Sequence, residues 1–310
     1  MANKQSETVK SIFDDLWNDY KKGYRELVAK FENNSYVVRG QKTISQVNRA
    51  LISDQYIMNH YGKDSRIIEA ACGNGFNTVF MAKKGYEIIG FDVSDSAIRD
   101  AKKLAVDEGV PDNIFSSSDH SFFKSVETSS VDCVIALGLM RYLEPMDNDT
   151  IYREVSRILK PGGCFLVTND NILSEIFAMN DGSLDFWSNQ ISDYSDVEAL
   201  FEDRSLLDVM SKHYKLPQRK FSANSASKHI KRLSKNPLTF ANEVAQYDLR
   251  LDKIYYPDTH LLPPLLESMV DQEALDDLKA KVALDRSEGD WRAMFMGFEF
   301  LTCLVHNDDG

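Results

Sequence analysis

Short apolar runs alternate with periodic apolar positions along most of the chain after residue 65. The continuous runs are typical of buried parallel strands and predict strands at residues 66–71, 87–93, 113–119, 131–138 and 164–169. Apolar residues at every third or fourth position predict helices at residues 78–84, 94–105 and 151–159. Beyond them the pattern predicts a helix at residues 237–247 and strands at 251–256 and 296–307. This alternation predicts an α/β fold with a doubly wound, Rossmann-like sheet.

Two amphipathic helices are predicted before the sheet begins. Apolar residues recur at helical spacing from Ile12 to Phe31 and again from Ile44 to Met58, and Gly62 then suits a helix end. Later in the chain, the alternation of strands and helices stops between Asn169 and the helix at 237–247. We interpret residues 171–235 as an inserted cap.

Charges are segregated within this insertion. Residues 181–208 hold eight acids and one base, whereas residues 209–242 hold eight bases and no acid. These bases are Lys212, Lys215, Arg219, Lys220, Lys228, Lys231, Arg232 and Lys235. One interpretation is that they attract a phosphate- or carboxylate-bearing partner, or an anionic membrane face. The other is that they neutralise the acidic residues before them, and the sequence leaves both open.

Composition and charge narrow the class of protein. The net charge of -12 disfavours binding of bulk nucleic acid, because the average surface repels a polyanion. The N-terminal residues are polar and no run of 18 apolar residues occurs, so we expect neither a signal peptide nor a transmembrane segment. The cysteines form no C-x-x-C pair, which argues against a zinc site; they are Cys72, Cys133, Cys164 and Cys303. We therefore expect a cytoplasmic protein with reduced thiols and no metal centre.

One loop carries the strongest chemical signal. Residues 67–77 read IIEAACGNGFN, an apolar strand that ends in an acid and opens into Gly-x-Gly. Such a loop brings backbone N–H groups at a helix start close to a nucleotide-like ligand, and we expect Gly75 to keep a side chain out of the ligand's space. A dinucleotide fingerprint requires a third glycine where this chain has Thr78. The dinucleotide pattern therefore fails.

The segment EAACGNG resembles the first motif of the class I S-adenosylmethionine-dependent methyltransferase family. Ala71 stands in place of the first glycine of that motif, a mild departure if its φ is negative. Further likenesses follow in order: GFDVS with Asp92, SSSDH with Asp119, the strand of VDCVIALGLMRYLEP, and LKPGGCFLVTN. The resemblance covers roughly residues 60–170 and 237–306, and implies a seven-stranded sheet with its last strand inserted antiparallel.

The resemblance implies S-adenosylmethionine as cofactor and assigns residues to it. Asp92 would accept hydrogen bonds from the ribose hydroxyls, Asp119 would accept from the adenine amino group, and Glu69 would lie near the amino acid end. Arg39 is a candidate partner for the cofactor carboxylate. The full set of candidate cofactor residues is Arg39, Glu69, Ala71, Gly73, Asn74, Gly75, Asp92, Val93, Ser118, Asp119, His120 and Leu137.

The resemblance also implies how the chain is divided into segments. Residues 1–62 would be a helical segment covering the cofactor site, and residues 63–310 the methyltransferase domain, with residues 171–235 as its substrate cap. The acceptor would be an oxygen or nitrogen atom of a small molecule or glycan. Candidate catalytic side chains near it are Tyr142, Tyr256 and His260; a general base is needed only for a hydroxyl or a protonated amine.

Two other functions stay open at this point: a dinucleotide-binding oxidoreductase and an inactive cofactor-binding scaffold. Thr78 argues against the first, and the presence of both Asp92 and Asp119 argues against the second. The sequence leaves the identity of the acceptor and the oligomeric state undetermined.

Overall fold

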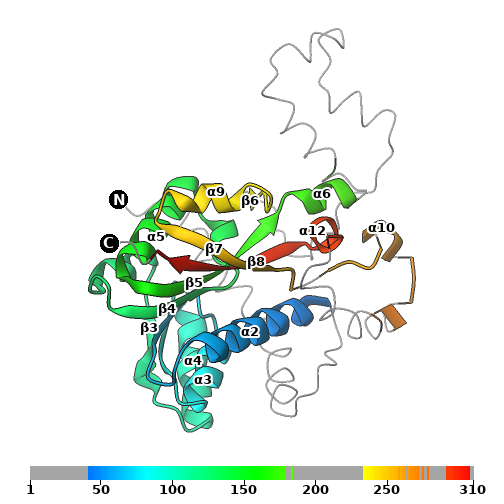
Figure 1. Ribbon diagram of the computed structural model, residues 1–310. Helices are drawn as coiled ribbons and strands as arrows, with labels where there is room; N and C mark the ends of the chain where they lie inside the picture. Colours follow the sequence, from blue (N-terminus) through cyan, green and yellow to red (C-terminus); the bar gives the residue numbers. More distant parts are fainter. Residues whose placement is uncertain are drawn as a thin grey trace.

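The computed structural model describes residues 41–178, 183, 233–257, 259–262, 264–267, 269–271, 274–275, 278 and 291–307 (Figure 1). These residues build a sheet with strand order β3-β2-β1-β4-β5-β8-β7. Its strands are β1 (Arg66–Ala70), β2 (Glu87–Asp92), β3 (Phe115–Ser117), β4 (Val131–Ala136), β5 (Leu159–Asn171), β7 (Leu249–Tyr255) and β8 (Glu299–His306). A two-residue strand, β6 (Ser234–Lys235), pairs with β5 beside this path.

The pairing confirms the predicted Rossmann-like sheet. Strands β1 to β5 pair in parallel, with Ile67 of β1 opposite Ile88 of β2 and Cys133 of β4. Strand β8 lies between β5 and β7 and runs antiparallel to both, as the resemblance implied. The order reverses at β1, since the chain builds β2 and β3 on one side and then crosses to β4 on the other. Ligands of doubly wound sheets bind at the carboxyl ends of the strands beside such a switch point.

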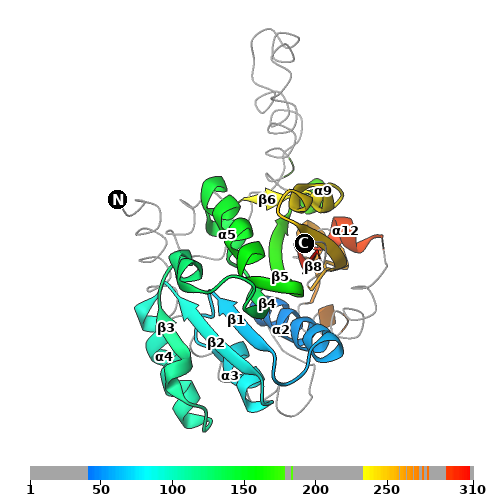
Figure 2. The same ribbon diagram turned by 60° about the vertical axis from the view of Figure 1, so that its left-hand side comes forward.

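Helices cover both faces of the sheet (Figures 1 and 2). One face carries α2 (Gln41–His60), α3 (Phe76–Lys83) and α4 (Asp95–Asp107). The other carries α5 (Pro145–Ile158) and α9 (Phe240–Ala245). Shorter elements are α6 (Leu173–Phe177), α10 (Pro264–Glu267), α12 (Ala293–Met296), η1 (Asp112–Ile114), η2 (His120–Ser125) and η3 (Met140–Tyr142).

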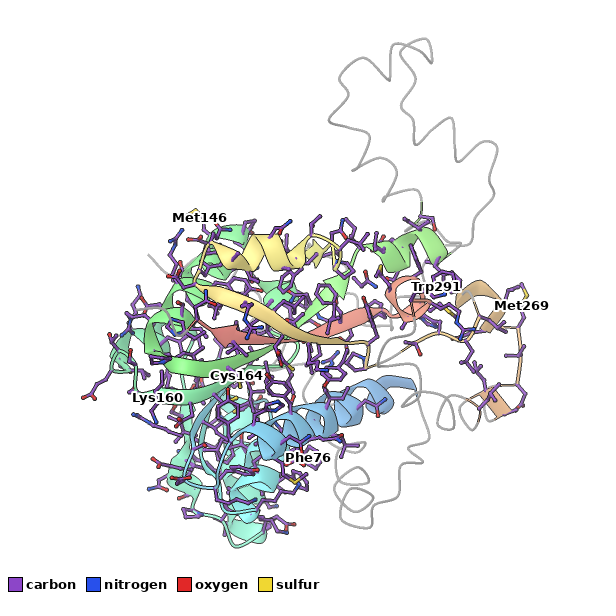
Figure 3. All side chains as sticks on the ribbon, in the orientation of Figure 1. Phe76, Met146, Lys160, Cys164, Met269 and Trp291 are labelled. Atoms are coloured by element: carbon purple, nitrogen blue, oxygen red, sulfur yellow. The ribbon has the colours of Figure 1, made fainter. Side chains whose placement is uncertain are left out.

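Apolar side chains on the two faces of the sheet form separate parts of the core. On the α5 face, Tyr152 and Phe165 are fully buried with Phe240 of α9. On the α2 face, Ile57 and Met81 belong to one apolar cluster with Cys164 of β5. Figure 3 labels Cys164. Fully burying one such side chain stabilises the folded state by roughly 1.5–3 kcal/mol. The apolar layers on both faces therefore hold the sheet against its helices.

Several predicted elements are confirmed, some with longer bounds, such as α2 and β5, and others with shorter bounds, such as β3 and β8. The second predicted helix is α2, and Ser94 caps α4 by accepting a hydrogen bond from the Ala97 N–H at 3.2 Å. The strand predicted at 164–169 runs from Leu159 to Asn171. The first predicted helix and most of the predicted cap lie outside the described residues, although Asn171 belongs to β5 and Lys235 to β6. Among the helices of the described part, none has both the length and the apolar character that a membrane span needs.

Candidate active site

The loop after β1 adopts left-handed backbone conformations. Ala71 has φ 55°, Gly73 has φ 55° and Gly75 has φ 74°. The condition under which Ala71 would be a mild departure, a negative φ, is therefore not met. A residue with a Cβ pays about 1–2 kcal/mol to adopt this conformation, which is why glycine suits the position better. Hydrogen bonds from the Cys72 N–H to the Phe91 carbonyl (3.0 Å) and from the Gly75 N–H to the Cys72 carbonyl (2.9 Å) hold the loop.

Gly75 is required by packing beneath the loop. A Cβ built at this position would lie 2.6 Å from Phe115 Cε1 and 2.9 Å from Ala101 Cβ. Both neighbours are buried, and they belong to β3 and α4. A side chain at residue 75 would thus enter the core, and the expectation that it would enter the ligand's space is wrong. The backbone of Gly75 remains a candidate for contact with the ligand.

Asp92 joins two loops at the carboxyl edge of the sheet. Its Oδ2 accepts from the Gly73 N–H at 2.9 Å, and its Oδ1 accepts from the Ser94 N–H at 2.8 Å. The carboxylate is half-buried and stands at the end of β2, beside Val93. Each carboxylate oxygen thus binds a main-chain N–H group of a different loop.

Glu69 is buried beneath the same loop. It accepts hydrogen bonds from Asn77 Nδ2 at 3.0 Å and from Thr78 Oγ1. Burial raises the pKa of Glu69 to about 7, although these hydrogen bonds act in the opposite direction. Glu69 therefore ties β1 to the first turn of α3.

The contact with Glu69 explains why this chain has threonine where dinucleotide folds have a third glycine. The Thr78 hydroxyl donates to Glu69, and a Cβ built at Gly90 on β2 would lie 2.8 Å from Thr78 Oγ1. Helix α3 can therefore lie close to β2 because the glycine stands on the strand, at Gly90, and faces the threonine on the helix.

The loop after β3 lies at the same carboxyl edge of the sheet. The Ser118 N–H donates to the Asp92 carbonyl at 2.9 Å, which joins this loop to the end of β2. Asp119 is exposed and caps η2, with Oδ1 accepting from the Ser121 N–H at 2.9 Å. This interaction with Ser121 lowers the pKa of Asp119. His120 is half-buried, with Nε2 3.8 Å from Asp147 Oδ1.

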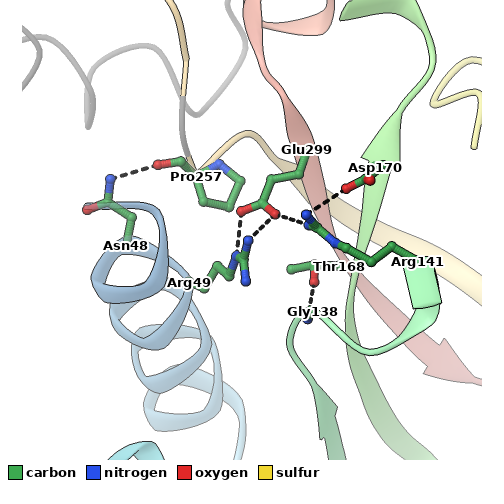
Figure 4. A network of polar contacts seen from close by, with 8 residues as sticks. All are labelled: Asn48, Arg49, Gly138, Arg141, Thr168, Asp170, Pro257 and Glu299. Atoms are coloured by element: carbon green, nitrogen blue, oxygen red, sulfur yellow. Dashed lines mark hydrogen bonds and ion pairs between the residues drawn. The ribbon is translucent and has the colours of Figure 1, made fainter. Parts of the chain in front are cut away.

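A buried ion-pair network lies farther along the edge, and sequence reasoning missed all four of its residues (Figure 4). Glu299, at the start of β8, accepts from Nε and Nη2 of Arg49 on α2 and from Nη2 of Arg141 on η3. Arg141 Nη1 also lies 2.8 Å from Asp170 Oδ1 at the end of β5. Burial disfavours the charged guanidinium of Arg141, but Asp170 and Glu299 outweigh it and raise its pKa. An acid directly before the apolar run of β8 signals such a partner, because a buried charge needs one.

This network, named here the Glu299 network (Arg49, Arg141, Asp170 and Glu299), borders the carboxyl end of β4. Leu137 and Gly138 follow that strand, and the Gly138 N–H donates to Thr168 Oγ1 at 2.6 Å. A Cβ at Gly138 would lie 3.1 Å from Arg49 Nη1. The network therefore adjoins the half-buried candidate cofactor residue Leu137.

The three candidate catalytic residues differ in environment. Tyr142 is half-buried on η3. Tyr256 is buried after β7, and burial raises the pKa of its hydroxyl to about 12, which disfavours a role as base near neutral pH. His260 has a side chain 25% exposed, and its Nδ1 lies 2.7 Å from Glu267 Oε2.

Hydrogen bonds join Glu69, Asp92 and the loops after β1, β2 and β3 into one group, whereas Tyr256 and His260 lie after β7, on the far side of β8. Arg39 and most bases of the cap lie outside the described residues. Lys235, the described base of that stretch, forms an ion pair with Glu243 of α9.

Comparison with known proteins decides the family. A sequence model of the methyltransferase domain matches residues 67–163. The chain carries a class I S-adenosylmethionine-dependent methyltransferase domain. S-adenosylmethionine is the methyl donor of this family, and the oxidoreductase alternative is set aside.

Individual relatives resemble this methyltransferase domain over part of their length. A ubiquinone biosynthesis O-methyltransferase of Paracidovorax citrulli is 23% identical over 114 residues, which are 37% of this chain and 47% of the relative. A carboxy-S-adenosyl-L-methionine synthase of Shewanella loihica is 27% identical over 165 residues, or 50% and 65%. The chain thus spans about half the length of the first of these relatives.

Among solved structures, the magnesium protoporphyrin IX methyltransferase of Synechocystis PCC 6803, determined with bound S-adenosylmethionine, has the same fold. It matches over 99% of each chain with a TM-score of 0.50 and 11% identity. At that identity the likeness establishes the fold alone.

Proposed function

We propose that this protein transfers a methyl group from S-adenosylmethionine to an oxygen or nitrogen atom of a small-molecule or glycan-type acceptor. The domain match supports the reaction class. The observation that carries the proposal is the carboxylate of Asp92, which accepts from the glycine loop and from the following loop at once.

The residues at this edge fit the donor. Asp92 is a half-buried carboxylate at the end of β2, the type of group that accepts charge-assisted hydrogen bonds from ribose hydroxyls. Asp119 is exposed, and its lowered pKa keeps it ionised near neutral pH, which suits an adenine amino group. The left-handed conformations of Ala71, Gly73 and Gly75 form a tight loop whose glycines carry no side chain, which fits close approach of a ligand to the main chain. When bound, the donor supplies a methyl group already activated on a sulfonium, so the protein's part is alignment and exclusion of water.

The proposed acceptor rests on the sequence relatives and on the basic stretch of the cap. The sequence relatives named as ubiquinone biosynthesis O-methyltransferases favour oxygen over nitrogen. The proposal of a phosphate- or carboxylate-bearing acceptor rests on the basic stretch of the cap. Lys235 pairs with Glu243 of α9, which lies outside the acidic residues 181–208, so this base supports neither interpretation of the stretch. A cytoplasmic location remains the expectation from the sequence.

Calorimetric titration with S-adenosylhomocysteine tests the donor site. Asp92→Asn should weaken binding by about 1.5–3 kcal/mol, or roughly 10- to 150-fold, because hydrogen bonds to a charged acceptor are lost. Asp132→Asn is the matched control: Asp132 accepts from Lys160 and from the Arg66 N–H near the starts of β4 and β1, at the opposite edge of the sheet. Equal affinity of both variants and the wild type would remove Asp92 from the site.

Two further measurements separate the alternatives. Binding of NAD in place of S-adenosylhomocysteine would contradict the proposal and restore the oxidoreductase. Release of S-adenosylhomocysteine with a panel of hydroxyl- and amine-bearing acceptors distinguishes an active enzyme from an inactive scaffold, which would bind the cofactor and release nothing.

A further inference from the structure

A histidine and a buried carboxylate form a dyad in the loop after β7. His260 Nδ1 lies 2.7 Å from Glu267 Oε2. Glu267 is 2% exposed and also accepts from the Leu261 N–H at 2.7 Å and, more weakly, from the Leu262 N–H at 3.4 Å. The carboxylate is therefore surrounded by donors.

This arrangement selects one tautomer of the imidazole. A carboxylate that accepts from main-chain N–H groups is an acceptor toward the imidazole as well, so Nδ1 carries the hydrogen. The lone pair then resides on Nε2. Within the described residues Nε2 makes no hydrogen bond, and the side chain is partly exposed. His260 is thus oriented as a base with its accepting nitrogen available.

The loop is anchored to the carboxyl edge of the sheet. The His260 N–H donates to the Met296 carbonyl at 2.9 Å, and Thr259 forms a bridge with Gly297. Asn171, which ends β5, donates from Nδ2 to the Gly297 carbonyl at 2.8 Å. The dyad therefore sits beyond the Glu299 network, on the same edge as the ends of β4 and β5.

We propose that His260 is the general base of methyl transfer, that Glu267 is its positioning residue, and that the acceptor atom is a hydroxyl oxygen. The inference rests on the proposed function. The acceptor oxygen forms its bond to the methyl carbon as the carbon–sulfur bond breaks and leaves its electron pair on sulfur. The hydroxyl proton passes to His260 Nε2, and the resulting imidazolium is stabilised by Glu267 and later releases the proton to solvent. A neutral amine would need no such base for the transfer itself.

The test uses the full chain with catechol and phenol as hydroxyl probes, and aniline as an amine probe. His260→Ala should lower kcat for the hydroxyl probes by about 10²–10⁴-fold, and added imidazole should restore part of it. Glu267→Gln, which keeps one acceptor oxygen for the loop, should lower kcat roughly 10- to 100-fold with little change in KM. His60→Ala, at the exposed end of α2, is the matched control and should be unchanged.

Titration with S-adenosylhomocysteine separates the two proposals. Both dyad variants should bind it as the wild type does; failure of the wild type to bind would overturn the proposed function itself. Wild-type kcat in Glu267→Gln and His260→Ala, or loss without rescue by imidazole in a folded His260→Ala, would overturn the dyad. Methylation of aniline but of no hydroxyl probe, or of no probe at all, would overturn the hydroxyl acceptor.

Discussion

The Glu299 network offers a direct test of how the sheet edge is held. Glu299 is fully buried and binds two guanidinium groups, one on α2 and one on η3, with side-chain exposures of 13% and 5%. Glu299→Gln keeps the shape of the side chain and removes its charge. Asp170 then remains as the one acid of the network facing two buried cations.

The magnitude follows from burial. Removing one partner of a buried ion pair costs about 3–5 kcal/mol, because the remaining charge is left uncompensated out of water. The amide oxygen of glutamine can still accept from one arginine, which places the expected loss toward the lower end of that range. A loss of this size should lower the melting temperature by roughly 10 °C.

Urea unfolding, followed by circular dichroism, measures this loss. The matched control is Glu108→Gln, which removes the same charge from a solvent-exposed pair with Lys83. That variant should cost about 0–1 kcal/mol, since water screens the pair and solvates the remaining lysine. If the two variants lose the same stability, the network does not hold the edge as argued.

Two more predictions concern the loop after β1. Ala71→Gly should raise the free energy of unfolding by up to about 1 kcal/mol, because it relieves the left-handed strain. Gly75→Ala should lower the free energy of unfolding by more than about 1 kcal/mol, because the new Cβ would collide with Phe115. Urea unfolding that shows a loss of stability in both variants would contradict this. Because burial raises the pKa of Glu69 from 4.5 to about 7, the native state binds that proton more tightly, so stability should increase as pH falls from 7 toward 4.5, by up to about 1.4 kcal/mol per pH unit. Glu69→Gln should lack this component in a pH series of urea midpoints, and an unchanged slope would contradict it.

Much of the sheet could be predicted because its determinants are local. Buried parallel strands have continuous apolar sequences such as RIIEA and VDCVIA, and the helices between them carry one apolar face. Asp92 and Asp119 stand where strands end, so their position at one edge follows from the parallel order alone. The cap by Ser94 is likewise a matter of a few neighbouring residues.

Other features depend on contacts between residues that are distant in sequence, and the sequence alone does not identify these contacts. The left-handed φ of Ala71 breaks the local preference for a negative φ, which the surrounding hydrogen bonds override. Residue 75 must be glycine because a side chain there would collide with Phe115 and Ala101, which lie later in the sequence. His260 could be picked out from its loop, but Glu267 gained a role only when the fold showed its carboxylate against Nδ1.

The Glu299 network shows how such long-range partners connect the two halves of the proposed site. Arg49 and Glu299 are separated by 250 residues in sequence, yet they join α2 to the strand inserted between β5 and β7. Arg141 adds the loop after β4, which begins with the candidate cofactor residue Leu137. Two residues before Glu299, Gly297 contacts both Asn171 and the loop of His260. The donor side and the dyad are therefore positioned through the same start of β8, which gives the buried acid Glu299 a structural role between two phenylalanines, Phe298 and Phe300.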